Sequence, residues 1–181
     1  MKTLILEKIP RILKNKDKLE KKLDVKITNR GKELFIEGLP EDEFIAEQVI
    51  DALEFGFPFS VALLIKDEEN IFEIIPIKNH TKRKDLRSIR ARIIGEGGKT
   101  LRTLSELTKC NFELKDNEIG IIAEPEYIKI IQNIIISLIK GTKTANVYAY
   151  LEKHKPEPVF DFGLREKKKR LGEDSNFRHH G

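Results

Sequence analysis

One ten-residue stretch determines how this sequence is interpreted: Arg92-Ile93-Ile94-Gly95-Glu96-Gly97-Gly98-Lys99-Thr100-Leu101. Apolar residues recur at helical spacing on both sides of its glycines, which predicts one helix over residues 86–94 and another over residues 99–108. Asp85 can accept a hydrogen bond at the start of the first helix. The glycines therefore form a tight loop between two helices, where a backbone without side chains can approach a ligand closely.

Three nucleotide-binding motifs share features with this loop, and the spacing of its glycines separates them. A P-loop, GxxxxGK[ST], needs glycine five positions before Gly98, where Ile93 stands instead. The dinucleotide-binding fingerprint GxGxxG, counted from Gly95, needs glycine where Thr100 stands, and it follows a strand. The third motif is the GxxG clamp of a KH domain, which lies between two helices and holds about four unpaired nucleotides. Only this third motif fits.

The expected elements around the loop have the order of a KH domain, β-α-α-β-β-α. A strand is expected over residues 71–77, and Pro76 predicts that it lies at the edge of its sheet. Two strands are expected over residues 111–114 and 118–123, and a helix over residues 124–140. The glycine loop lies between the two helices of this order, where a KH clamp belongs.

The first part of the chain repeats this order without the glycine loop. Strands are expected over residues 3–7, 25–28 and 34–36, and helices over residues 14–23 and 40–54. The residues of the last helix expected to face the core are Phe44, Ile45, Val49, Ile50 and Leu53. We therefore predict an α+β fold of two tandem type I KH domains, in which helices pack on three-stranded sheets.

These elements divide the chain into four parts. They are a degenerate KH domain without GxxG (residues 1–57), a connector (58–70), the KH domain with the clamp (71–140) and a C-terminal helix with a basic tail (141–181). The C-terminal helix is expected over residues 144–155. Beyond Pro158 we expect disorder, because the tail is strongly charged around residues 165–170 and poor in apolar residues.

Charge is distributed unevenly along the chain. The net charge is +4, but residues 1–32 hold 11 basic and 4 acidic residues, and residues 33–73 hold 1 basic and 12 acidic residues. Residues 78–110 hold 10 basic and 3 acidic residues. Positive charge around a glycine loop favours a polyanion such as RNA. The residues predicted to bind RNA are Arg87, Arg90, Arg92, Ile94, Gly95, Glu96, Gly97, Gly98, Lys99, Thr100, Leu101 and Arg102.

Each part of the predicted clamp has a physical role. Gly95 and Gly98 let the backbone approach a sugar-phosphate chain, and the amides that begin the second helix favour phosphate. Ile94 and Leu101 supply an apolar floor for the bases. Glu96 places a carboxylate near the phosphates, which costs affinity unless Arg92 or Lys99 neutralises it.

Cysteine and histidine residues are few and scattered, and apolar runs are short, which disfavours several classes of protein. The single cysteine, Cys110, excludes an intrachain disulfide, fits a reducing cytoplasm and is expected to be a small buried apolar group. His80 and His154 are isolated, and metal-ligand spacing is absent. The richest apolar run is too short and interrupted to span a membrane. We expect a cytoplasmic binding protein with no cofactor or metal, and not an enzyme.

The clamp and its surroundings resemble the second KH domain of the archaeal and eukaryotic Pno/Krr family. The resemblance spans about residues 1–155. It rests on the clamp, on Gly56-Phe57 followed by Ala62-Leu63-Leu64, on the Glu124-Pro125-Glu126 helix start, and on Val147-Tyr148 with Leu151. It implies a two-KH factor of small-ribosomal-subunit assembly, closer to the Pno branch. Such a factor binds single-stranded RNA near the 3′ end of small-subunit rRNA and assists its maturation.

The same resemblance implies partners and a division of labour between the domains. The expected partners are the endonuclease that cuts the 3′ end and other assembly or initiation factors, without a membrane. The first KH domain would serve as a protein-packing platform, which agrees with the glycine-free segment Lys14-Asn15-Lys16-Asp17 at the clamp position. Two alternatives stay open: a general KH RNA-binding protein, and an adaptor whose acidic surface around Glu41, Asp42 and Glu43 docks a basic partner.

Overall fold

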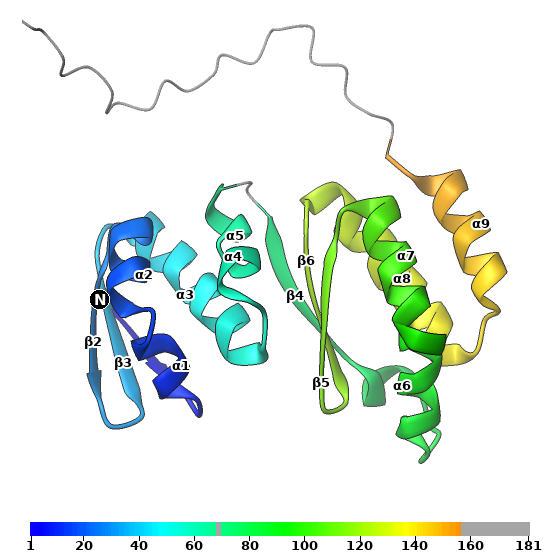
Figure 1. Ribbon diagram of the computed structural model, residues 1–181, viewed down its shortest axis with the longest axis horizontal. Coiled ribbons are helices and arrows are strands. Elements are labelled where there is room, and N and C mark those ends of the chain that lie inside the picture. Colours follow the sequence, from blue (N-terminus) through cyan, green and yellow to red (C-terminus); the bar gives the residue numbers. More distant parts are fainter. Residues whose placement is uncertain (68–69, 157–181) are drawn as a thin grey trace, which may run out of the picture.

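The computed structural model describes residues 1–67 and 70–156, which form two units of like topology (Figure 1). The predicted basic tail and its expected disorder lie outside the described residues. The first unit contains β1 (Lys2–Ile5), α1 (Ile9–Leu13), α2 (Lys16–Leu23), β2 (Lys26–Arg30), β3 (Glu33–Glu37) and α3 (Pro40–Phe55). The second contains β4 (Ile71–Pro76), η1 (Ile77–His80), α6 (Leu86–Ile94), η2 (Glu96–Gly98), α7 (Lys99–Thr108), β5 (Asn111–Lys115), β6 (Glu118–Ala123) and α8 (Pro125–Lys140).

Both sheets are antiparallel and have three strands, with the last strand of each unit in the centre. The orders are β1-β3-β2 and β4-β6-β5. The predicted edge position of the strand that ends at Pro76 is confirmed, because β4 pairs only with β6 among the described strands. The second unit is followed by α9 (Thr144–His154), which packs on α8 through the buried side chains of Val147 and Leu151.

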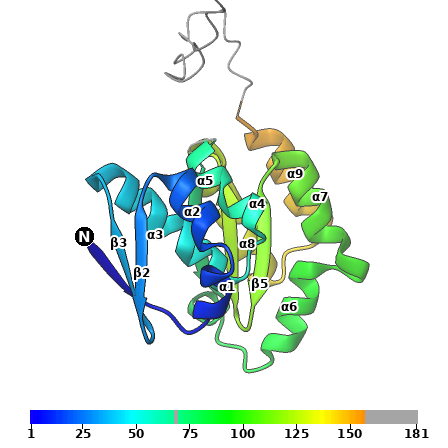
Figure 2. The ribbon, with the colours of Figure 1, turned by 60° about the vertical axis from the view of Figure 1, so that its left-hand side comes forward.

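The layers alternate along the long axis of the molecule. Figure 1 shows the first sheet, then α1 to α3, then the short helices α4 (Phe59–Ala62) and α5 (Leu64–Asp67), then the second sheet, and finally α6 to α9. The turned view agrees with this arrangement (Figure 2). The second sheet is thus covered on both faces, and its central strand β6 is buried from Ile119 to Ala123.

Aromatic side chains join the two units. The rings of Phe55 and Phe57 lie 6.1 Å apart, and each lies within 6 Å of the ring of Phe72, which belongs to the second sheet. A Cβ atom at Gly120 would lie 2.6 Å from the Phe55 ring, so only glycine lets β6 approach these rings. Ile122 of β6 belongs to the core of the first unit. The two units therefore share one apolar junction.

The first unit contains a helix that the sequence analysis missed. The predicted helix over residues 14–23 begins at Lys16, and α1 precedes it with Pro10 in its first turn. Proline favours the first turn because its nitrogen has no hydrogen to donate. Arg11 on α1 donates hydrogen bonds to the carbonyl oxygens of Gly56 (2.8 Å) and Phe57 (2.9 Å), which stabilise the end of α3. The connector predicted as an apolar segment contains α4 and α5.

The prediction that Phe44 faces the core is wrong. Its side chain is 56% exposed, whereas Val49, Ile50 and Leu53 are buried as expected. The Lys2 ammonium lies 5.3 Å from the centre of the Phe44 ring, and the ring lines a surface groove together with Ile71. The apolar face of α3 is therefore covered by the core only beyond its first turns. No helix among residues 1–67 and 70–156 is long and apolar enough to cross a membrane.

Candidate nucleic-acid interface

The glycine loop has a backbone that only glycine adopts readily. Gly95, Gly97 and Gly98 have φ angles of +77°, +58° and +78°. Gly95 combines its positive φ with a ψ of 172°, a conformation that is essentially confined to glycine. Its N–H donates to the carbonyl of Ala91 (2.9 Å), and Gly98 N–H donates to the carbonyl of Gly95 (3.2 Å). The loop is thus closed by its own backbone and ends α6 sharply.

The two ends of the loop differ in what surrounds them. A Cβ atom at Gly95 would overlap the Thr100 hydroxyl and lie 2.8 Å from the Thr100 backbone nitrogen, so the loop packs directly against the first turn of α7. At Gly97 and Gly98 an added Cβ would meet nothing within 4 Å. This backbone lies open at the start of α7, where the N–H groups of Gly98 and Lys99 donate to the carbonyls of Gly95 and Glu96. The positive end of the helix dipole favours a phosphate group at this position. The open end is where a nucleotide chain can approach.

The charged residues around the loop have different surroundings. Glu96, Lys99 and Arg102 are exposed, and the guanidinium of Arg102 donates to the carbonyl oxygen of Gly97 (3.4 Å). Arg90 donates to the carbonyl oxygen of Asp116 (2.8 Å), which ties α6 to the turn between β5 and β6. Arg87 is exposed on α6. These cations border the loop and the helix before it.

Arg92 does not lie where the sequence analysis expected it. Its guanidinium donates to the carbonyl oxygen of Leu138 at 3.5 Å, and a Cβ atom at Gly141 would lie 3.4 Å from it. A cation at this position stabilises the negative end of the α8 dipole. Arg92 is therefore directed to the end of α8 and not to Glu96. A contact of Arg92 with RNA stays a prediction.

The outer edge of β5, the strand next to α7, is open. β5 pairs only with β6 among the described strands, so its other edge has free backbone groups. The half-buried side chains of Leu101, Phe112 and Leu114 pack against the core on the helix side of the sheet, and Ile94 is half-buried before the loop. Backbone amides, apolar side chains and cations thus occur together here, which is the combination that unpaired nucleotides require.

The expectation for Cys110 is confirmed. Its side chain is 1% exposed, and burial raises the pKa of its thiol to about 11. The thiol is therefore protonated at neutral pH and a poor nucleophile. Among residues 1–67 and 70–156, no group of three or more His, Cys, Asp or Glu side chains could hold a metal ion.

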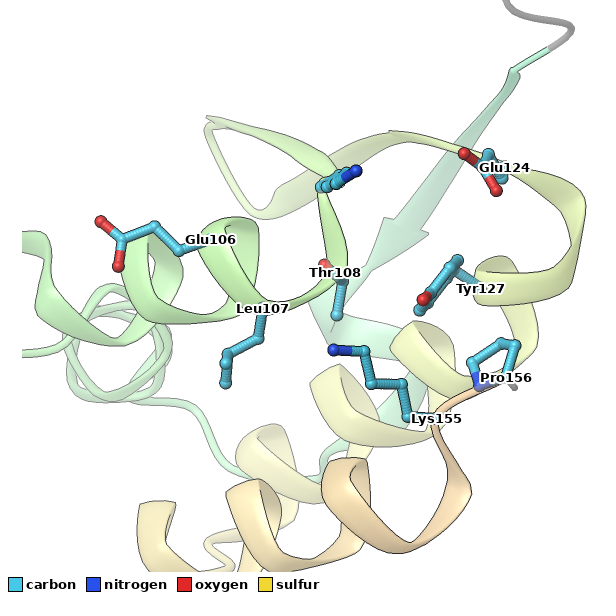
Figure 3. A pocket seen from close by; sticks show the side chains of 8 residues that line it. Glu106, Leu107, Thr108, Glu124, Tyr127, Lys155 and Pro156 are labelled. Carbon is cyan, nitrogen blue, oxygen red and sulfur yellow. The ribbon is translucent and has the colours of Figure 1, made fainter. Parts of the chain in front are cut away.

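A hollow of about 590 Å³ at the far end of α7 was not anticipated from the sequence (Figure 3). Its lining residues come from the ends of α7, α8 and α9 and are Glu106, Leu107, Thr108, Lys109, Glu124, Tyr127, Lys155 and Pro156. Burial and the Glu124 carboxylate raise the pKa of Tyr127, so its phenol is protonated at neutral pH. The mixed charges of the lining favour no single ligand. Because the residues are far apart in sequence, no local pattern predicts the hollow.

The second unit matches a described family. Residues 71–156 match the eukaryotic-type KH domain (KH-domain type I), in the form of the second KH domain of Pno1. These residues are therefore similar to the KH domain of the Pno1 type. The family match does not test which residues bind RNA, and the first unit lies outside it.

Two curated relatives are similar over a longer part of the chain. The RNA-binding protein pno1 of Drosophila pseudoobscura is 30% identical over 139 residues, which are 72% of this chain and 58% of the relative. The pre-rRNA-processing protein pno1 of Schizosaccharomyces pombe is 34% identical over 102 residues, 55% of this chain and 42% of the relative. The chain thus spans about half the length of the curated relatives it matches.

Two archaeal crystal structures are similar in fold to most of the chain. Dim2p from Pyrococcus horikoshii has a TM-score of 0.76 and 25% identity, over 84% of this chain and 98% of that protein. A complex of a/eIF2α, aDim2p and rRNA from the same organism contains a chain with a TM-score of 0.75 and 25% identity, over 84% of this chain and 92% of that one. The similarity covers more of this chain than residues 71–156.

The contrast between the loop glycines gives a test of the loop geometry. Gly95→Ala should lower the free energy of unfolding by about 3 kcal/mol, because it adds a clash with Thr100 to an unfavourable backbone conformation. Gly97→Ala should cost only about 1–2 kcal/mol, the usual penalty of a left-handed residue. Urea denaturation of both variants measures the difference. Equal losses would contradict the packing of Gly95 on α7.

Proposed function

We propose that this protein is an RNA-binding factor of small-ribosomal-subunit assembly. Its second KH domain would bind single-stranded rRNA near the 3′ end of the small-subunit rRNA and assist its maturation. The observation that carries this proposal is the glycine loop at the start of α7, with open backbone at Gly97 and Gly98. A Pno1-type domain match and relatives named for RNA binding and pre-rRNA processing support it.

The proposed RNA contacts follow from the geometry of the loop. Backbone amides at the start of α7 would take a phosphate, with Lys99 and Arg102 offsetting charge. The half-buried Ile94 and Leu101 would support bases beside the open edge of β5. Arg87 and Arg90 would follow the backbone along α6, and Glu96 would face solvent or Lys99. This role needs binding and no chemistry, so we propose a protein that is not an enzyme.

The first unit is proposed to be a degenerate KH domain. Its elements have the order β-α-α-β-β-α, and Lys14 and Asn15 lie between α1 and α2, where the second unit has its glycine loop. The N–H of Asn15 donates to the carbonyl of Ile12, so this turn is a compact continuation of α1 without glycine. A tight approach of a phosphate chain is not favoured there. The unit instead supports the second sheet.

The proposed partners are proteins of subunit maturation and translation initiation. The archaeal complex named for a/eIF2α, aDim2p and rRNA supports an initiation-factor subunit and rRNA as partners of this chain. The endonuclease that cuts the 3′ end is proposed from the resemblance of the sequence alone. A cytoplasmic location is part of the same proposal.

Fluorescence anisotropy tests the clamp directly. A labelled single-stranded oligonucleotide from the 3′ end of small-subunit rRNA should bind the wild-type chain more tightly than a scrambled one at fixed salt. The variant Glu96→Asp with Gly97→Asp should lose at least about tenfold in affinity, because the carboxylate added at position 97 lies at the open backbone where the phosphates would approach. Aspartate tolerates the left-handed backbone of residue 97, so the variant should stay folded.

The outcomes separate the functions under consideration. Equal binding of both oligonucleotides would favour a general KH RNA-binding protein. Unchanged affinity of the folded variant would contradict the clamp. Circular dichroism of the variant serves as the control for folding.

A specific groove favours a second function, that of a protein adaptor. It measures about 660 Å³ and lies between α3 and the segment that leads into β4. Phe44 and Ile71 line it with 56% and 39% of their surface exposed, and its charged lining residues are Glu41, Asp42 and Lys66. An apolar lining with two carboxylates and one ammonium fits a partner segment that has an apolar anchor and basic residues.

One charge on α3 has an energetic cost that lies outside the groove. Burial, together with the charges of Glu47 and Glu54, raises the pKa of Asp51 on α3 to about 6. Since the pKa is raised on folding, ionised Asp51 destabilises the fold, and the cost develops as the pH rises from about 4 through 6. None of these three carboxylates lines the groove, so this cost is separate from docking there. Glu43 does not belong to the free acidic surface, because it is buried and accepts from the Gly38 N–H (3.1 Å) and the Met1 amine (2.8 Å).

Charge reversal tests the adaptor function with an archaeal initiation factor 2 α subunit as the probe. Glu41→Lys with Asp42→Lys should weaken binding of the subunit at least about tenfold by calorimetry, because it removes the attraction at the groove. The matched control, Glu33→Lys with Glu37→Lys, makes the same charge change on exposed positions of β3. Binding that is equally strong in the groove variant and the wild type would contradict docking at the groove.

A further inference from the structure

A basic hollow lies between the segment that leads into α6 and the C-terminal end of α8. Its volume is about 400 Å³, and its lining comes from the segment between β4 and α6 and from the last residue of α8. The lining residues are Lys78, Asn79, His80, Thr81, Lys82 and Lys140. The lining thus contains three lysines and a histidine and has no acidic side chain.

The cations of this region are not neutralised within the described part of the chain. Arg83 and Lys84 follow the lining residues in sequence, so residues 78–84 carry four Lys or Arg and no Asp or Glu. No ion pair among residues 1–67 and 70–156 includes these cations or Lys140. The next carboxylate, Asp85, accepts from the Ser88 N–H (3.2 Å) and caps α6. Clustered cations repel one another in the free protein, so an anion would be favourable there.

The turn between β5 and β6 bonds both to the segment that lines the hollow and to the helix that leads to the clamp. Buried Ile77, at the start of the segment, donates its N–H to the carbonyl of Asn117 (2.9 Å). Arg90 of α6 donates to the carbonyl of the preceding residue, Asp116 (2.8 Å). The turn between β5 and β6 therefore fixes both the basic segment and the helix that leads to the glycine loop.

Arg92 links the glycine loop to the hollow. It belongs to the last turn of α6 before the loop, and its guanidinium lies beside Leu138 and Gly141, next to Lys140 of the hollow. Arg87 and Arg90 are spaced i, i+3 on another flank of α6, where Arg90 donates to the carbonyl of Asp116. A strand leaving the clamp past Arg92 would meet positive charge on the way to the hollow.

We propose that the hollow is a second RNA-backbone site, which binds phosphates of the strand held by the clamp, beyond the roughly four nucleotides of the clamp. Lysines are flexible point charges, so they suit phosphates and carry little base specificity. The open, charged lining offers no enclosed apolar surface for a small ligand. This inference rests on the proposed RNA-binding function and adds length, affinity and salt dependence to it.

Oligonucleotide length tests the proposal. The triple variant Lys78→Gln, Lys82→Gln and Lys140→Gln of the full chain is titrated with a labelled tetranucleotide and a labelled 12-mer over a series of salt concentrations. The matched control is Lys14→Gln, Lys18→Gln and Lys21→Gln, which removes the same charge from exposed positions of the first unit. Affinity for the 12-mer should fall about tenfold in the triple variant, and the salt slope should become less steep by about 2. Tetranucleotide affinity should stay within about twofold, because the clamp is untouched.

Three results would overturn the inference. One is unchanged 12-mer affinity in the triple variant, and another is an equal loss for both oligonucleotides. The third is the same loss of 12-mer affinity in the control variant, which would show that the loss follows from net charge and not from the hollow. Inorganic phosphate at constant ionic strength should not displace the 12-mer, and displacement would indicate a simple anion site instead.

The two oligonucleotides distinguish a failure of the proposed clamp from a failure of the proposed site in the hollow. Absence of tetranucleotide binding by the wild type would count against the proposed clamp. Binding of the 12-mer that is lost in the triple variant would still support the hollow as an RNA-backbone site.

Discussion

The aromatic junction between the two units is the contact on which the rest of the structure depends. Phe55 and Phe57 of the first unit meet Phe72 over the bare backbone of Gly120, so the second sheet is closed on that face. Its other face is covered by α6, α7 and α8. The surfaces of the second unit that remain open to a ligand are therefore the outer faces of these helices, the β5 edge and the two ends of α6. The first unit supports the nucleic-acid interface by occupying the one sheet face that could compete with it.

The glycine loop and its basic surroundings form one electrostatic arrangement on this framework. Gly95 packs so closely on Thr100 that the loop is fixed, while Gly97 and Gly98 have open backbone. Positive side chains extend from the loop to the hollow at Lys78, and the acidic surface lies on the first unit. The acidic excess is confined to residues 33–73, since residues 1–32 of the first unit are themselves basic. RNA and a basic protein segment would approach different parts of the molecule and need not compete.

The sequence was most informative where local chemistry determines structure. The bounds of the helices around the loop are confirmed, because the Asp85 cap and the glycines define their ends. The missed α1 has only five residues, too few for a periodic pattern. The exposure of Phe44 and the position of Arg92 depend on which elements pack beside α3 and α6, and sequence periodicity does not contain that information. The groove and both hollows join distant segments for the same reason.

Amide chemical shifts of the labelled chain, followed by NMR during titration with a tetranucleotide, test directly whether the glycine loop binds RNA. If it does, the resonances that shift belong to the glycine loop, the first turn of α7 and the facing edge of β5. The resonances of the first unit should not shift, because the junction holds that unit away from the RNA. Shifts confined to the first unit, or none in the loop at saturating RNA, would show that the loop is not the RNA-binding site.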